Sequence, residues 1–500
     1  MLASSHTVPQ AQLSVPDRAA GRRSRANSWR GLALAVFLIG YFLYFNWGSL
    51  RVHFALDDLG NIRHYFEIPP AQRALGCFLV WRGDFRPLGA LFYLSLYHFS
   101  GLNPVPYQGA LLAILAANAY FAYRLVRLLG AGELPAALVA LVCCYHGGLE
   151  NLYYNAAFVY DAMCSCLYLA ALVFYLRIRN RGRLPGAAET AVFLALVLAA
   201  LDAKEMAVSL PVMVLAYEWI YHPPVKWHRA SLLAWLRGPA RAAWFAAVLT
   251  ALDIYGKVTG PDAMTNAAGY RPVFTLERLQ QFQVALIQDL ALSRSWTPGW
   301  GTIIGLYMVL LYLAWRRADR PALRWLFWYL VVTPLPIEFL PGKREACFAV
   351  IMVGAAAFVA VVFVDAAWTA ARFLAGEFRP PLPPEIFLAM IVLLSACLWA
   401  AEQREIRTQV GGTPMTTLGF ETWDIIEQMR ASRFHPHPGA SVVFLEDPFH
   451  SLDMYSLARL WFHDRSVTIH APSQGPLTAQ EVAKMDYVFT FEGRKLIRIR

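Results

Sequence analysis

The chain has 500 residues, of which 58% are hydrophobic and only 16% are charged, and its mean hydropathy is +0.41. A soluble domain averages roughly 25% charged residues, so this composition excludes a soluble protein and predicts an integral membrane protein. The net charge of +10 does not indicate nucleic-acid binding. The basic residues form short clusters between apolar runs, where such residues determine membrane topology.

The N-terminal segment, residues 1–30, is rich in Ser, Arg and Ala, and we expect a disordered cytoplasmic tail there. The apolar run 31–50 that follows is too long for the core of a signal peptide, so it predicts an uncleaved signal anchor. The seven cysteines show no metal-ligand spacing, and we expect them to pack as small apolar side chains.

Eleven apolar runs predict membrane crossings, and together they make up a transmembrane domain over residues 31–401. They are 31–50, 105–123, 133–149, 156–176, 188–202, 206–221, 242–257, 299–315, 323–340, 346–368 and 384–401. With the N-terminus inside, every cytoplasmic connection is basic, as topology rules require. Residues 86–101 are too short for a span, and counting them would invert the later loops. We therefore expect an interfacial helix there, within a first outer loop over 51–104.

After residue 401 the composition becomes that of a soluble α/β module. We predict a buried strand at 440–445, a helix near 451–462, a strand near 466–470 and a terminal strand pair at 487–499. With eleven crossings, this domain of residues 402–500 lies outside the cytoplasm. The predicted fold class is a polytopic α-helical membrane protein with a small C-terminal α/β domain.

Two adjacent acids, Asp57 and Asp58, come directly after the first predicted span. Adjacent carboxylates repel, which raises the pKa of one of them unless a cation lies between them. Such a pair suits a general base, a metal ligand, or both. The alternative is a structural role, in which Asp58 caps a short helix that begins at Leu59.

Charged residues also interrupt the apolar pattern at later outer turns. Lys204 and Glu205 separate two apolar runs, and a charge at membrane depth costs about 2.5–3.5 kcal/mol. They either form a tight hairpin at the outer surface, or Lys204 faces an anionic lipid head group and is oriented by Glu205. Lys343 and Arg344 form a basic outer turn that would clamp a phosphate or bind an anionic lipid surface. Arg86 either pairs with a carboxylate of its own loop or contacts phosphate.

Two further polar residues, His146 and Asp161, lie near the outer ends of the third and fourth predicted spans. An isolated histidine is more often a satisfied polar residue than a catalytic one, so both are secondary candidates. The loop 258–296 is long enough to cover a site but shows no motif.

The order of these motifs resembles a family. The acid pair after the first span, RPL at 86–88, NPVPYQ at 103–108, AKEMAVSLPVMVLAYE at 203–218 and PGKREACF at 341–348 are similar to motifs of membrane glycosyltransferases with the GT-C fold. The resemblance is to the O-mannosyltransferase-like branch, which includes the transmembrane and tetratricopeptide-repeat proteins. No such repeats follow here. Glu345 stands where the family has an aromatic residue after Arg344, and Gln108 stands where it often has His.

The resemblance implies transfer of a sugar from a polyprenyl-phosphate carrier to the hydroxyl of a glycan or protein acceptor, on the outer face of a membrane such as the bacterial inner membrane. It implies that Asp57 deprotonates the acceptor, and that Asp58 orients the acceptor or binds a divalent cation such as Mg or Mn. Lys204 and Arg344 would neutralise the carrier phosphate, with Glu205 positioning Lys204 and with Arg86 assisting. Displacement at an anomeric carbon needs a base on one side and a stabilised leaving group on the other.

Two other functions are compatible with the sequence. A transporter or flippase for a lipid-linked glycan would carry charges at the centres of its spans and Gly/Pro-broken helices in paired halves. In this chain the charges lie near the ends of the spans, and we find no paired halves. A non-catalytic envelope scaffold would keep the fold without the chemistry.

Overall fold

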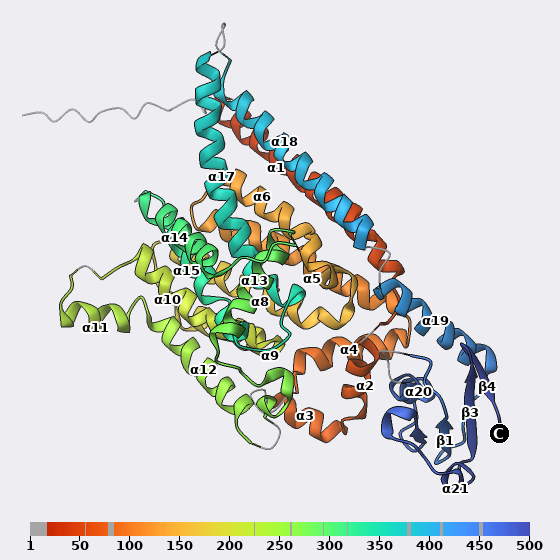
Figure 1. The fold of residues 1–500 in the computed structure, drawn as a ribbon. Helices are drawn as coiled ribbons and strands as arrows, with labels where there is room; N and C mark the ends of the chain where they lie inside the picture. Colours follow the sequence, from red (N-terminus) through yellow and green to blue (C-terminus); the bar gives the residue numbers. More distant parts are fainter. Residues whose placement is uncertain are drawn as a thin grey trace, which may run out of the picture.

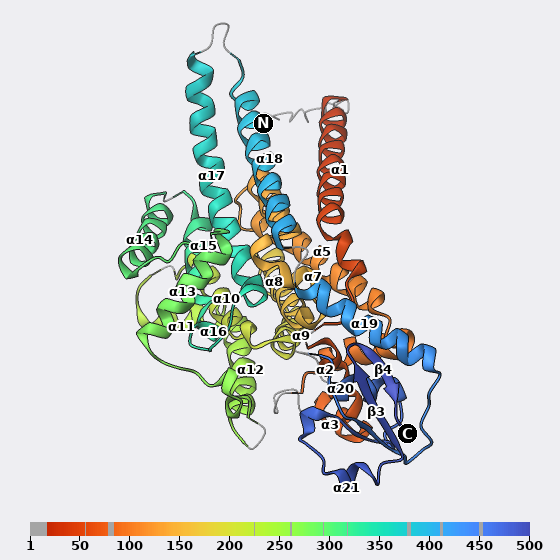
Figure 2. The ribbon, with the colours of Figure 1, turned by 45° about the vertical axis from the view of Figure 1, so that its right-hand side comes forward.

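The computed structural model describes residues 18–55, 57–78, 85–224, 226–260, 263–293, 295–317, 319–377, 382–410, 414–449 and 454–500. Most of the predicted tail 1–30 therefore lies outside the described residues. The chain forms a bundle of helices, and α1, α17 and α18 extend past the other helices at one end (Figures 1 and 2). A small sheet lies at the opposite end (Figures 1 and 2).

The first half of the bundle contains the helices α1 (Arg18–Asn46), α2 (Asp58–Glu67), α3 (Pro70–Phe78), α4 (Pro87–Ser100), α5 (Pro104–Leu128), α6 (Glu133–Cys144), α7 (Glu150–Tyr154), α8 (Val159–Arg179) and α9 (Ala187–Ala203). The second half contains α10 (Leu210–Tyr221), α11 (Arg229–Arg237), α12 (Arg241–Val258), α13 (Leu276–Leu290), α14 (Trp300–Arg316), α15 (Pro321–Val332), α16 (Leu335–Glu338), α17 (Ala349–Glu377) and α18 (Pro384–Val410). Each predicted crossing thus contains an α-helix.

Within the described residues, five segments are long and apolar enough to cross a membrane by length and composition. They are Gly31–Arg51, Pro104–Leu128, Ala156–Arg179, Glu345–Glu377 and Pro384–Thr408. Two shorter apolar helices, Glu133–Cys144 and Trp300–Arg316, accompany them. The chain is therefore an integral, polytopic helical protein, and the count of eleven crossings stays a prediction.

Several predicted spans are interrupted where the sequence opposes a continuous helix. The third predicted span is helical only as far as Cys144. After this residue the backbone turns, before the Gly147–Gly148 pair. In the ninth, α15 ends at Val332, two residues before Pro334, which cannot extend the backbone ladder of the helix. Helix α4 has 14 residues, fewer than the roughly 20 that a span needs, and it packs on α2, α5 and α9.

The loop 258–296 contains an element that the sequence analysis did not predict. Helix α13 begins after Thr275, whose side chain accepts the amide of Arg278, and it buries Phe282 and Leu286. Its apolar positions four residues apart form one stripe that faces the bundle.

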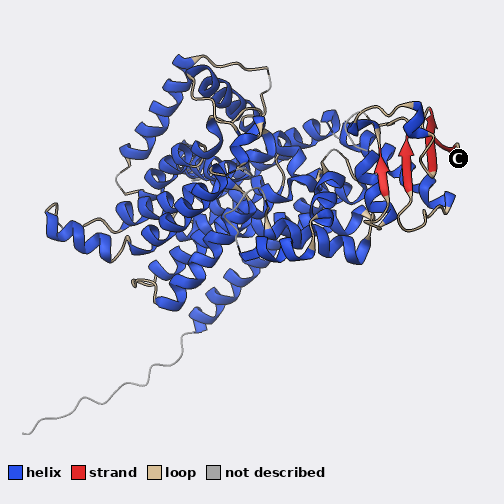
Figure 3. Cartoon of the chain, turned by 90° about the horizontal axis from the view of Figure 1, so that it is seen from below, coloured by secondary structure: helices blue, strands red, loops and turns tan. Residues whose placement is uncertain are grey.

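The C-terminal domain follows α18, which continues to Val410 and so passes the predicted boundary at residue 401. It contains α19 (Pro414–Ser432), β1 (Ser441–Phe444), α20 (Met454–Phe462), β2 (Thr468–His470), α21 (Ala479–Val482), β3 (Tyr487–Glu492) and β4 (Lys495–Arg498). The sheet order is β2-β1-β3-β4, with parallel pairs around β1 and an antiparallel β3–β4 pair. These strands lie at the predicted positions, at one end of an otherwise helical chain (Figure 3).

Candidate active site

The two acids after the first span lie in different environments. Asp57 is exposed and precedes α2, whereas Asp58 is the first residue of α2 and only 2% exposed. The Asp58 carboxylate accepts the amide of Ala55 at 2.9 Å and so fixes the turn before the helix. Burial raises the pKa of Asp58 to about 7. Asp57 is therefore the accessible carboxylate of the pair, and Asp58 has a structural role at the start of the helix.

A second charged group joins the start of α4 to the turn after α9. Arg86 Nη2 donates to Glu205 Oε1 at 2.7 Å, and Lys257 Nζ at the end of α12 lies 3.6 Å from the same oxygen. Burial alone would raise the pKa of Glu205, but the two cations lower it to about 2. Asp202 accepts the amide of Leu88 at 2.8 Å and fixes the first turn of α4. Arg86, Glu205 and Lys257 therefore form an ionic network beside α4.

Lys204 is held separately from Glu205. Its Nζ lies 2.6 Å from both carboxylate oxygens of Asp161 and 3.7 Å from Cys347 Sγ. Burial disfavours the ammonium, but the Asp161 carboxylate overcomes this and raises the pKa of Lys204. The predicted pairing of Glu205 with Lys204 is thus not what the structure shows. Adjacent residues point to different partners because the backbone of Lys204 is extended before the 3-10 turn Glu205–Ser209.

Tyrosines connect the acid pair to the ionic network. Tyr65 of α2 and Tyr160 of α8 have their hydroxyls 2.8 Å apart, and the guanidinium of Arg86 lies 5.0 Å from the Tyr160 ring centroid. Tyr93 accepts from Asn61 at 3.3 Å and donates to the carbonyl of Ala156 at 3.1 Å. The helix that follows Asp57 is therefore packed through aromatic side chains against the residues that hold Arg86.

The basic turn 343–344 lies over the same end of the bundle. Lys343 Nζ is 4.0 Å from the ring centroid of Tyr270, and Cys347, three residues after Arg344, lies 3.7 Å from Lys204 Nζ. Arg344 bonds Asp289 of α13 at 2.9 Å, yet half of its side chain stays exposed. Glu345 has a left-handed backbone with φ 50°, a strained conformation that is frequent at functional sites. Arg344 is thus anchored but accessible.

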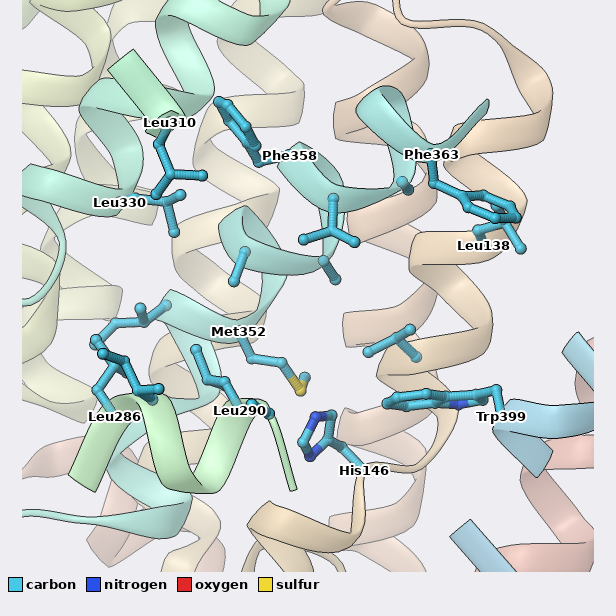
Figure 4. Close-up of a pocket in the computed structure, with 18 of the residues that line it drawn as sticks. Leu138, His146, Leu286, Leu290, Leu310, Leu330, Met352, Phe358, Phe363 and Trp399 are labelled. Atoms are coloured by element: carbon cyan, nitrogen blue, oxygen red, sulfur yellow. The ribbon is translucent and has the colours of Figure 1, made fainter. Parts of the chain in front are cut away.

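An apolar cavity of about 500 Å³ opens among α6, α13, α14, α15, α17 and α18. Its lining includes Leu138, Leu286, Leu310, Leu330, Phe358 and Phe363, and His146 and Trp399 lie together at one end (Figure 4). At that end Leu290 also lines the cavity, and its neighbour Asp289 is the residue that binds Arg344. An apolar chamber therefore ends close to an accessible guanidinium.

His146 belongs to the wall of this cavity. Its ring lies 5.5 Å from that of Trp399, and its Nδ1 accepts the amide of Gly148 at 3.2 Å. Asp161 acts as the counter-ion of Lys204. The structure therefore gives both secondary candidates structural partners.

The part of the chain that the structure describes contains no group of three or more His, Cys, Asp or Glu residues arranged to hold a metal ion. Asp58 is buried, accepts a backbone amide and has a raised pKa, which favours the neutral acid. The binding of a divalent cation such as Mg or Mn by Asp58 stays a prediction.

Three charged residues of the site, Lys257, Asp253 and Asp289, were not among the predicted site residues. Lys257 and Asp253 are one helical turn apart and 3.4 Å from each other, and a Lys–Asp pair at this spacing within an apolar span was a visible signal. Asp289 lies on α13, within the segment 258–296 that the sequence predicts as a loop. Its partner Arg344 is 55 residues away, and no local pattern relates the two.

No family model matches the chain, and no curated protein matches it. Among solved structures, it is similar to ArnT from Cupriavidus metallidurans bound to undecaprenyl phosphate, with a TM-score of 0.53 and 13% identity over 95% of this chain and 98% of that chain. It also matches the Archaeoglobus fulgidus oligosaccharyltransferase, in the apo form and tethered with an acceptor peptide. Those two matches have TM-scores of 0.48 and 12–13% identity, and they cover 89% of this chain and 64–65% of those chains. The likeness to ArnT extends over nearly the whole of both chains, so this protein has the GT-C membrane fold that its motifs predicted.

Proposed function

We propose that the protein is a glycosyltransferase that moves a sugar from a polyprenyl-phosphate carrier to an acceptor hydroxyl on the outer face of a bacterial inner membrane. The observation that carries the proposal is the apolar cavity whose lining reaches Leu290, next to Asp289, which binds the half-exposed Arg344. An apolar chamber next to an accessible cation suits a ligand with a long hydrocarbon chain and an anionic head.

The fold supports the same ligand class. ArnT, which shares it, was solved with undecaprenyl phosphate bound, and this is a polyprenyl phosphate. In this chain the hydrocarbon would occupy the cavity between α13 and α17. The phosphate would meet Arg344 and Lys343, because a guanidinium and an ammonium both bind phosphate oxygens.

The chemistry divides between two groups of residues. Asp57 takes the proton of the acceptor hydroxyl, whose oxygen then attacks the anomeric carbon as the bond to the carrier phosphate breaks. The cations Arg344 and Lys343 stabilise the negative charge left on the phosphate. Arg86, fixed by Glu205, adds positive charge next to Tyr160.

The test is transfer of labelled sugar from a panel of polyprenyl-phosphate donors by the purified, lipid-reconstituted chain. We expect transfer with at least one donor, and we expect Asp57→Asn to lower kcat by about a hundredfold or more, as loss of a general base does. Asp424→Asn changes another exposed aspartate, on α19, and serves as the matched control.

The same vesicles distinguish the alternatives. Movement of the lipid-linked sugar across the bilayer without transfer would support a flippase instead. Binding of donor with neither transfer nor movement would support a scaffold. Full activity of Asp57→Asn would refute the assignment of the base while leaving the transferase intact.

A further inference from the structure

The C-terminal domain contacts the chain on both sides of the acid pair. Before the pair, His53 stacks on Trp423 of α19, with ring centroids 4.6 Å apart and planes inclined by 20°, and it meets the edge of Phe420 at 5.3 Å. The backbone of α19 at Gly419 also packs closely against the backbone of His53. A Cβ at Gly419 would lie 2.9 Å from the carbonyl oxygen of His53, a distance that leaves no room for a side chain.

After the pair, the far end of α2 is bound by α20. Glu67, the last residue of α2, accepts from the Tyr455 hydroxyl at 3.0 Å and from Arg459 Nε at 3.1 Å. Arg63, one turn earlier, bonds the other oxygen of Glu67 at 3.0 Å, and its guanidinium lies 5.0 Å from the Tyr455 ring centroid. The Glu67 carboxylate therefore accepts hydrogen bonds from α2 and from α20, on both sides of the contact between the domains.

The same domain also contacts the end of α4, the helix whose start is at Arg86. The Tyr97 hydroxyl donates to the carbonyl of Leu460 at 2.5 Å and lies 2.9 Å from His463 Nδ1. His463 adopts a left-handed backbone with φ 53°, and its ring lies 5.2 Å from that of Phe66. Arg465 adds a bond to the carbonyl of Phe66.

The contacts of α2 and α4 with the C-terminal domain follow the same arrangement. The N-terminal ends of α2 and α4, next to Asp57 and Arg86, lie at the candidate site, and the last turns of both helices contact the C-terminal domain. Helices of 10 and 14 residues are about 15 and 21 Å long. They are rigid over this distance, so a shift of the domain at one end moves the charged residues at the other.

We propose that the C-terminal domain is a positioning element, which sets the place of the Asp57–Asp58 pair by contacting the chain at His53, before the pair, and at the last turn of α2, after it. His53, Glu67, Trp423 and Arg459 are the positioning residues, and none of them touches the reacting atoms. A role in catalysis rests on the proposed transferase function, whereas the mechanical coupling of the domain to α2 does not.

The experiment compares the full-length protein with Glu67→Ala, Trp423→Ala and the double variant in lipid nanodiscs. Hydrogen–deuterium exchange of residues 57–67 reports on α2, and exchange of α5 reports on the integrity of the bundle. We expect the double variant to exchange about tenfold faster in α2 and unchanged in α5. We expect kcat to fall about tenfold or more with the donor KM within about twofold, because a misplaced base affects the chemical step.

Two further variants make the result specific. Glu67→Gln keeps an acceptor oxygen for Tyr455 and Arg459, so it should restore most of kcat. Glu421→Ala removes the partner of Arg494 inside the C-terminal domain and leaves the contact with α2 intact, so neither readout should change. The single variants are measured as well, so a double variant that fails to fold still leaves two independent tests.

Unchanged exchange in α2 would overturn the coupling. Faster exchange with normal kcat would overturn its role in positioning the base. Absence of transfer by the wild-type protein would instead refute the proposed function, and the exchange data would still decide whether the domain holds α2.

Discussion

Two buried lysines at the candidate site are held in different ways. Lys257 shares Glu205 with Arg86 and bonds the carbonyl of Leu201 at 3.0 Å, whereas both oxygens of Asp161 surround the ammonium of Lys204. Lys204 is 9% exposed and Asp161 is 4% exposed. A buried ion pair of this kind satisfies its own charge, so Lys204 supports the site more than it attracts an anion.

Lys204→Met should therefore destabilise the protein by about 3–5 kcal/mol, because it leaves the Asp161 carboxylate buried without a counter-ion. The double variant Asp161→Asn/Lys204→Met removes both charges and should recover much of this loss. Thermal unfolding in detergent measures both effects. Lys343→Met removes a partly exposed cation from the Tyr270 ring and should cost about 1 kcal/mol or less. A Lys204→Met protein of normal stability that no longer binds donor would contradict this assignment.

The buried carboxyl of Asp58 should make stability depend on pH. Its pKa of about 7 lies above the value of about 3.9 for an unfolded aspartate. Between these values the folded chain binds a proton that the unfolded chain has lost, so stability falls as pH rises through this window. From pH 5 to pH 8 the fall from this group should be about 3 kcal/mol, and Asp58→Asn should remove it.

Unfolding midpoints of the wild type, Asp58→Asn and the exposed-site control Asp424→Asn at pH 5 and pH 8 would measure this difference. The unfolding midpoint should fall by the same amount between pH 5 and pH 8 in the wild type and in the control, and by less in Asp58→Asn. An equal fall in all three proteins would show that Asp58 titrates normally.

At the scale of elements, the positions of most helices could be predicted from the apolar runs, because burial in lipid requires long apolar stretches. The strands of the C-terminal domain were located because β1 and β3 are apolar segments bounded by turns. Helix α13 was missed because Gln280, Gln281, Gln283 and Gln288 dilute its apolar stripe. The apolar stripe of Phe282, Leu286 and the partly buried Leu290 is recognisable only at a helical period.

The candidate site was only partly predictable. Some residues of the site could be predicted because a charged side chain at the end of an apolar run costs free energy and is therefore often functional. They are Asp57, Arg86, Glu205 and Arg344. Their partners could not be selected. Arg86 and Glu205 are 119 residues apart in sequence, and their pairing follows from the packing of α4 against α9, which no local pattern encodes.

For the whole molecule, the relation between the apolar cavity and the charged end of the bundle gives the function its most direct test. Ala356 of α17 lines the cavity, opposite residues of α13 and α14. If the cavity holds the polyprenyl chain, Ala356→Trp should raise the donor KM by about tenfold or more and change kcat little, because it removes binding space far from the reacting atoms. Leu398→Trp on α18, where the native side chain is 62% exposed, adds an indole to an outer face and should leave KM unchanged. Steady-state kinetics with a long-chain and a short-chain donor separate the effects, since a short chain that does not reach Ala356 should be used equally well by both variants. A normal KM for the long-chain donor in Ala356→Trp would place the carrier outside this cavity.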